Sequence, residues 1–200
     1  MGGIMSIILQ GSTSGSVTLQ EPAVAGTTVL TLPAVSGTVL TTTSPKAGNV
    51  IQVVSTTKTD AFSSTSTSFT DITGLSVSIT PTASSSKILV MYSLSMSAIS
   101  GEYSSIFRMV RGSTAICIGD TSGSRTRATN MNRTSTGNQN QSWVLSQNFL
   151  DSPATTSSTT YKIQGFVQAG TFYVNRTQLN DDGDYIGATT STITVMEIAA

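Results

Sequence analysis

The chain has 200 residues, and its ten basic and ten acidic side chains cancel. Only 10% of its residues are charged, against about 25% in an average globular protein, and it has no histidine. This length allows one ordinary domain with an appendage, or two small units. The balanced charges are scattered and form no basic surface, so we expect no nucleic-acid partner. The lack of histidine excludes Ser-His-Asp and Cys-His catalysis and histidine metal sites.

The composition predicts an all-β protein. Serine, threonine and valine are abundant, and 38% of the residues are hydrophobic. The β-branched side chains of threonine and valine lose rotamer freedom in a helix and pack well on a pleated sheet. Disordered chains combine few apolar residues with high net charge, and this chain has neither property.

Residues 1–48 contain short extended segments separated by glycine and proline. The segments are "IMSIILQ", "SVTLQ", "TTVLTL" and "GTVLTT". Strands this short bury little surface alone, so they need a partner surface or interlocking copies of themselves. We therefore expect residues 1–48 to form an N-terminal anchoring arm. Its expected anchoring or oligomer contacts are Val29, Leu30, Leu32, Val39 and Leu40.

Residues 49–200 show longer and more regular strand patterns. Apolar residues alternate with polar ones in "LSVSIT" and in "KILVMYSLSMS", which predicts strands with one buried face. Further candidates are "SSIFRMVRG", "TAICIG", "QSWVLSQNFLD", "TTYKIQGFVQ", "TFYVN" and "STITVMEIA", with turn-forming residues between them. About eight such strands predict an antiparallel, jelly-roll-like β-sandwich. The residues expected in its core are Leu75, Val77, Ile79, Ile88, Val90, Tyr92, Leu94 and Met96.

The stretch "SRTRATNMNRTSTGNQNQSW" concentrates arginine and amide side chains before Trp143. Arg125, Arg127 and Arg133 could hydrogen-bond an acidic sugar or a carboxylate of a neighbouring subunit. A solvated crossover loop is the competing interpretation. Trp143 alternates with apolar residues, so we expect it in the core.

No metal or cofactor site is assigned. "NDDGDY" gathers Asp181, Asp182 and Asp184 around Gly183, and their oxygens are ligands that calcium prefers. However, the stretch lacks the alternating acids and the distant glutamate of a calcium loop, which favours a solvated turn. No Ser-x-x-Lys phrase occurs either, so we expect no catalytic residues and no enzymatic activity.

Two observations bear on localisation. Cys117 is the single cysteine, so it cannot form an internal disulfide, and "TAICIG" is typical of a small buried residue on a strand. This pattern favours folding in a reducing cytoplasm. No apolar run approaches the roughly 18 residues of a membrane-spanning helix, so we expect no membrane partner.

Two groups of phrases carry a family resemblance. "GSTSGSVTLQEPAVAGTTVLTLPAVSGTVLTT" resembles an N-terminal phrase of virion structural proteins of tailed bacteriophages. "DITGLSVSITPTASSSKILV", "RMVRGST", "FLDSPATTSSTTYKIQ", "FYVNR" and "STITVMEI" are similar to a C-terminal β-domain of phage tail fibre or structural proteins. Together these phrases cover most of the chain. The resemblance implies a virion component, usually a homotrimer, without catalytic residues.

Three functions stay open at this point. The first is a trimeric capsid decoration or cement protein, held by its arm on other virion proteins such as the major capsid protein. The second is a short tail fibre or fibre tip that binds a host-surface glycan through the arginine stretch. The third, a free carbohydrate-binding module, is disfavoured because only 6% of the residues are aromatic.

Overall fold

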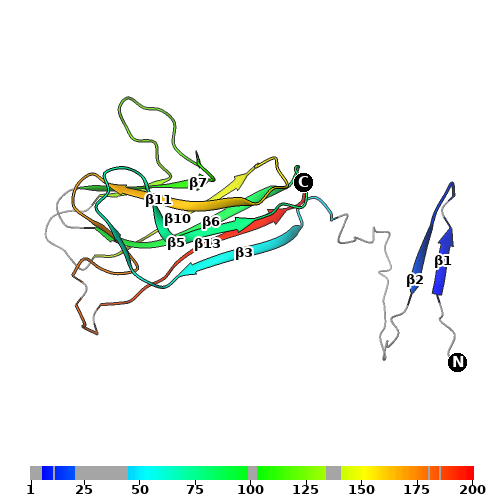
Figure 1. Cartoon of the computed structure of the whole chain (residues 1–200), viewed down its shortest axis with the longest axis horizontal. Helices are drawn as coiled ribbons and strands as arrows, with labels where there is room; N and C mark the ends of the chain where they lie inside the picture. The colour runs from blue at the N-terminus through cyan, green and yellow to red at the C-terminus, as the bar shows by residue number, and fades with distance from the viewer. Residues whose placement is uncertain are drawn as a thin grey trace. The chain divides into compact units, whose positions relative to one another are not determined.

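The computed structural model describes residues 6–10, 12–20, 45–98, 103–133, 141–179, 181–184 and 186–200. These residues form strands and loops, and none of them lies in a helix that could span a membrane. The chain divides into two compact units, residues 1–39 and 40–200. The structure therefore confirms the all-β prediction (Figure 1).

The described part of the first unit is one β-hairpin. Strand β1 (Ser6–Gln10) pairs antiparallel with β2 (Ser16–Gln20). Ile8 and Leu9 are 55% and 57% exposed. A two-stranded hairpin that leaves such side chains in water gains little stability from burial.

The second unit contains two sheets. In the first sheet β13 and β6 are the central strands, and β3 and β10 are the outer long strands. The short strands β4 and β12 pair with each other, and β12 also pairs with the end of β6. All pairs are antiparallel. The strands are β3 (Val50–Lys58), β13 (Ser191–Ile198), β6 (Lys87–Ala98), β10 (Trp143–Asp151), β12 (Phe172–Val174) and β4 (Phe62–Ser64).

The second sheet has the order β5, β11, β7, and two short strands share the far edge of β7. Its pairs are also antiparallel. The strands are β5 (Thr70–Ile79), β11 (Thr159–Val167), β7 (Ser104–Arg111), β8 (Thr114–Ile116) and β9 (Asn130–Arg133).

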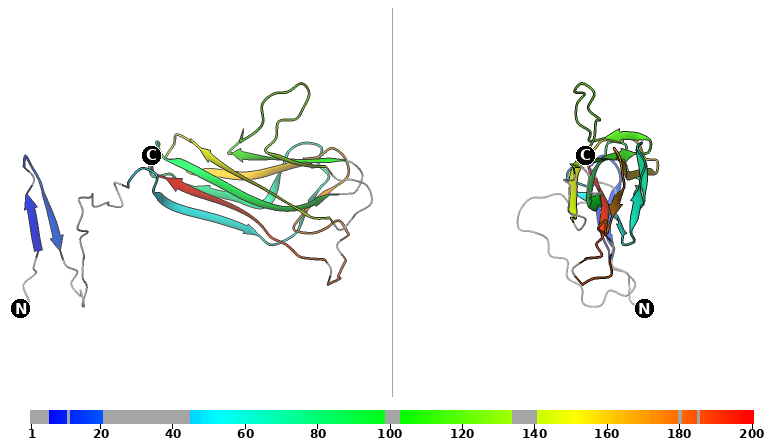
Figure 2. Two further views of the ribbon diagram at one scale, coloured as in Figure 1. Left: turned by 180° about the vertical axis from the view of Figure 1, so that it is seen from behind. Right: turned by 90° about the vertical axis from the view of Figure 1, so that its left-hand side faces the viewer.

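The connections between the sheets define the architecture. Along the chain, β3, β6, β10 and β13 belong to the first sheet, and β5, β7 and β11 alternate with them in the second. Two antiparallel sheets with strands alternating in this way form a jelly roll. Figure 1 and the two views in Figure 2 show the long strands of this unit packed together.

The core lies between the two sheets, as the alternating patterns predicted. All eight residues expected there are at most 4% exposed. They pack with aromatic side chains from β7, β11 and β12, namely Phe107, Tyr161 and Phe172. Trp143 is partly buried and packs against this cluster, which confirms its expected place.

Two predictions need correction, and the long strand β3 was not predicted. "VIQVVSTTK" forms β3, which the sequence analysis did not single out because two adjacent valines interrupt the alternation. "TAICIG" is a strand only as far as Ile116, and Cys117 is half-buried with a positive φ of 52°. Residues 130–133 of the arginine stretch form β9 instead of a loop.

Backbone hydrogen bonds join the beginning of the sandwich to its end. The Gly48 amide donates to the Ala199 carbonyl at 2.8 Å, and the Ala199 amide donates to the Asn49 carbonyl at 2.9 Å. The C-terminal residues therefore lie beside the start of β3 (Figure 1).

Candidate functional site

An apolar row crosses the outer face of the first sheet. Strand register places Val53 beside Met196, Met196 beside Leu89, and Leu89 beside Leu150, so the row includes all four long strands. We call these four residues the apolar row. Their chain neighbours pack inward, because Val90 and Val195 are fully buried and Val54 and Phe149 contact the core. Val53 and Leu150 are each 54% exposed.

The surroundings of the apolar row are uncharged over most of this sheet face. Val50, which is 53% exposed, pairs with Ile198 on one side of the row, and Met91 lies on the other side. Lys58, Asp151 and Glu197 also belong to these strands, but they are buried. Among the charged residues of the four strands, this leaves Lys87, whose Nζ donates to Ser152 Oγ at 2.9 Å.

The outer face of the second sheet combines apolar residues with paired charges. Register places Phe166 beside Ile106 and Ile106 beside Met131, which is 56% exposed. Asp71 accepts from Lys162 at 2.8 Å and from Gln164 at 2.7 Å, and Arg108 Nε donates to Gln164 at 2.9 Å. The Arg108 guanidinium also lies 3.9 Å from the centre of the Phe69 ring. This polar network suits contact with water, whereas an uncharged face with half-exposed aliphatic side chains suits contact with protein.

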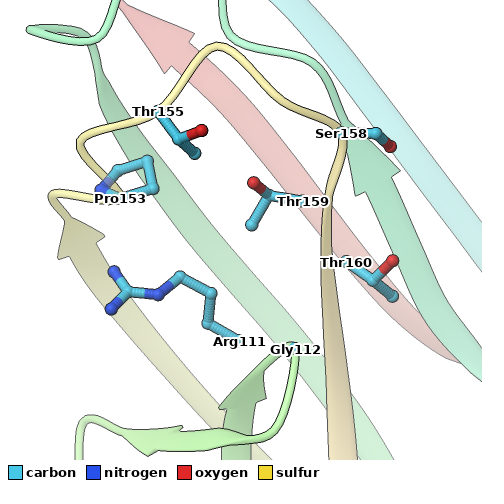
Figure 3. A pocket seen from close by; sticks show the side chains of 7 residues that line it. All are labelled: Arg111, Gly112, Pro153, Thr155, Ser158, Thr159 and Thr160. Atoms are coloured by element: carbon cyan, nitrogen blue, oxygen red, sulfur yellow. The ribbon is translucent and has the colours of Figure 1, made fainter.

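A pocket of about 320 Å³ opens at the end of β7, where Arg111 and Gly112 face the loop between β10 and β11. Pro153, Thr155 and Thr159 form other parts of its wall (Figure 3). Arg111 Nη1 donates to the two carboxylate oxygens of Asp151 at 2.8 and 2.9 Å.

Asp151 is held from a second direction by Tyr161. The Tyr161 hydroxyl donates to Asp151 Oδ2 at 2.7 Å, and Tyr161 is fully buried. Burial, and then the hydrogen bond to the carboxylate, raise the pKa of Tyr161 above its ordinary value. The hydroxyl therefore stays protonated and remains a donor to Asp151.

The structure does not bring the three predicted arginines together at one polar site. Arg125 and Arg127 are exposed in the loop before β9, and Arg127 Nε donates to the Gly119 carbonyl at 2.7 Å. Arg133 is exposed at the end of β9, where it pairs in register with Ser104. Arg127 thus has a structural contact within its own loop.

The other predicted positions divide into two groups. Asp181 and Asp182 line a pocket of about 280 Å³ with Asn175 and Arg176. Over the described ranges, no three metal-ligating side chains come close enough to hold an ion. The expected arm contacts Val29, Leu30, Leu32, Val39 and Leu40 lie outside the described residues.

The sequence analysis missed both features described above. "RGST" and "DSPATTSS" consist largely of turn-forming residues, and nothing in either phrase indicates that Arg111 meets Asp151. The apolar row could have been anticipated in part, because "WVLSQNFLD" has apolar residues at both odd and even positions. Such a pattern means that one strand has apolar residues on both faces.

Comparison with known proteins gave distant likenesses only. No protein-family model and no curated protein matches the chain. A solved structure of infectious bursal disease virus, Gt strain, is 18% identical over 96% of this chain and 46% of the other, with a TM-score of 0.38. Particles derived from the same virus are 16% identical over 96% of this chain and 44% of the other, with a TM-score of 0.36.

The chain therefore spans less than half the length of the viral structures it matches. These scores are too low to carry an argument about this chain. The strand order of the two sheets identifies the jelly roll.

Proposed function

We propose that the protein is a non-enzymatic structural component of a bacteriophage virion, which assembles as a homotrimer through the apolar row and is anchored by its N-terminal arm. The observation that carries this proposal is the difference between the two outer sheet faces. On one face paired charges lie among the apolar residues, whereas the other has a continuous apolar row across four strands, with Lys87 at its margin as the charged residue of those strands.

An assembly role explains why such a row is present. Burying half-exposed valine and leucine side chains gains about 25 cal/mol per Å² of apolar surface, so contact with another copy is favourable. Lys87, at the margin of the face, is the charged residue that these strands place there, so three copies of the face can converge on a three-fold axis without strong repulsion. The choice of three copies follows from the resemblance to phage virion proteins, which are usually homotrimers.

The arm supplies attachment in this proposal. Its last residue, Gly48, donates its amide hydrogen to the Ala199 carbonyl of the sandwich. A decoration or cement protein on the major capsid protein is the first candidate, because an uncharged apolar face suits packing among neighbouring proteins. A short tail fibre is the second candidate, and the Arg111 pocket is the observation that favours it.

Light scattering of the full chain tests the assembly. We expect three times the chain mass of 20.7 kDa at micromolar concentration. Leu150→Asp should dissociate the trimer without unfolding the sandwich, because the side chain is 54% exposed. Ser76→Asp is the matched control, since it adds the same charge to an exposed position on β5 in the second sheet.

A monomeric wild-type chain would contradict the trimer, and a trimeric Leu150→Asp variant would show that copies meet through another face. The virion role has a separate test, because purified particles can be imaged by electron microscopy. Density for three sandwiches on the capsid surface supports decoration. Density at the tail tip supports the fibre, and absence from particles would refute both placements.

A further inference from the structure

The Arg111 pocket contains hydrogen-bond donors that the contacts of Arg111 with the protein leave unused. Arg111 has three hydrogen bonds to protein, and all three leave from Nη1: two to Asp151 and one, at 3.4 Å, to the Ser152 carbonyl. In the part of the chain that the structure describes, Nε and Nη2 have no partner. Half of the guanidinium fork is therefore free to donate.

The guanidinium is also fixed in position. The Asp151 side chain is 6% exposed, whereas the Arg111 side chain is 29% exposed, so the buried carboxylate holds a partly open cation. The second donor to Asp151, the Tyr161 hydroxyl, fixes the carboxylate in turn. Such prior ordering reduces the entropy lost when a ligand binds.

The opposite wall supplies two threonine hydroxyl groups, one that can donate a hydrogen bond to a ligand and one that can accept. Thr155 Oγ1 accepts from the Ser157 amide at 3.0 Å and so keeps its proton for a ligand. Thr159 Oγ1 donates to the Ser157 carbonyl at 3.0 Å and so keeps a lone pair. In Figure 3 the two hydroxyl groups point toward each other across the upper part of the pocket.

The loop that carries Thr155 adds an apolar surface and backbone strain. The Pro153 ring lines the pocket, and Ala154 beside it is held at a positive φ of 52°. A non-glycine residue in this conformation is strained, and such residues are common at ligand sites. The loop is therefore held in a particular shape beside Arg111.

These groups together select one class of ligand. The free Nε and Nη2 donors match the two oxygens of a carboxylate, the threonines match sugar hydroxyls, and Pro153 can pack on the C–H face of a ring. No acidic residue in the described ranges lines the pocket, and the Asp151 carboxylate, which offsets the charge of Arg111, binds Nη1 and leaves Nε and Nη2 as donors. We propose that this pocket binds a uronic acid residue of a glycan, which goes beyond the assembly role and does not depend on it.

The test is an amide NMR titration of the full chain with methyl β-D-glucuronide, and with neutral methyl β-D-glucoside as the reference ligand. We expect saturable shifts of the Gly112 and Thr155 amides, and binding of the glucoside at least about tenfold weaker. No saturable shift with the glucuronide, or equal affinity for the two sugars, would overturn the proposal.

Variants separate the site from general surface binding. Arg111→Lys retains a charge for Asp151 but lacks the fork, so glucuronide affinity should fall at least about tenfold. Thr155→Val should reduce the glucuronide affinity several-fold. This substitution leaves the contact of Arg111 with Asp151 intact, so it tests the proposal even if the arginine variant does not fold. Ser158→Ala is the matched control, because Figure 3 shows its hydroxyl turned away from the pocket. Equal losses in Ser158→Ala and Thr155→Val would refute the assignment.

Discussion

At the scale of single residues, Glu197 shows how the sandwich accommodates a buried carboxylate without a cation. It is fully buried, and it accepts from Gln52 Nε2 at 2.6 Å and from the Thr82 amide and hydroxyl, each at 2.7 Å. Burial by itself would raise the pKa of Glu197, but the hydrogen bonds from Gln52, Ser86 and Thr82 outweigh it and lower the pKa below 4.5.

This lowered pKa gives a definite pH dependence. Glu197 contributes its full stabilisation above its unfolded pKa, near 4.5, and this contribution is lost as the pH falls through the lower folded pKa. Glu197→Gln should reduce the free energy of unfolding at about pH 7 by about 1.5–3 kcal/mol, because the new amide donors face Thr82. Below about pH 4 the difference between variant and wild type should shrink.

Urea unfolding at both pH values measures this effect. Asp120→Asn is the control, because Asp120 is an exposed acid. If the glutamine variant matched the wild type at neutral pH, the hydrogen bonds to Thr82 and Gln52 would not stabilise the loop at residues 80–86.

At the scale of the element, the period of two along each strand decides which side chains are buried. Val77 on β5 is 4% exposed, whereas the adjacent Ser76 is exposed and lies opposite Lys162 of β11. A shift of one residue would exchange the buried and exposed faces of the strand. The register of β5 against β11 therefore has a direct test.

Val77→Asp should lower the free energy of unfolding by about 3 kcal/mol or more, because it buries an unpaired charge. Ser76→Asp should change it by no more than about 0.5 kcal/mol, since the new carboxylate is solvated and faces Lys162. Chemical denaturation of the two variants compares them directly. Similar losses in both would mean that the register is wrong.

At the scale of the whole molecule, the sandwich has a complete core of its own. Among the described residues, its buried hydrophobic side chains all come from Ile72 onward. The Gly48 amide, just before its first strand, bonds to the Ala199 carbonyl. We infer that the arm contributes to attachment more than to the folding of this core.

Deletion of residues 1–44 should therefore leave a cooperatively folded sandwich that still forms trimers through the apolar row, but that no longer attaches to virions. Calorimetry, light scattering and a particle-binding assay measure the three properties. A truncated chain that decorates particles normally would refute the anchoring role. A chain that cannot fold would show that the arm belongs to the sandwich.

The sequence by itself determined the strand class and most of the buried face. Alternation in "KILVMYSLSMS" and "LSVSIT" identified residues that are now seen in the core, because side chains on a strand must alternate between faces whatever the neighbouring strand is. The same reasoning missed β3, where the valines at positions 53 and 54 face opposite sides of the sheet.

Only the tertiary structure decided which strands are neighbours and which side chains from distant segments are in contact. The apolar row needs β3, β13, β6 and β10 in one order and register, and no local pattern specifies which strands pair across a hundred residues. The contact of Arg111 with Asp151, and the close approach of Gly165 to Phe107 and Phe172, likewise join segments that are distant in the chain. Local periodicity follows from backbone geometry, whereas these surfaces depend on the packing of the complete fold.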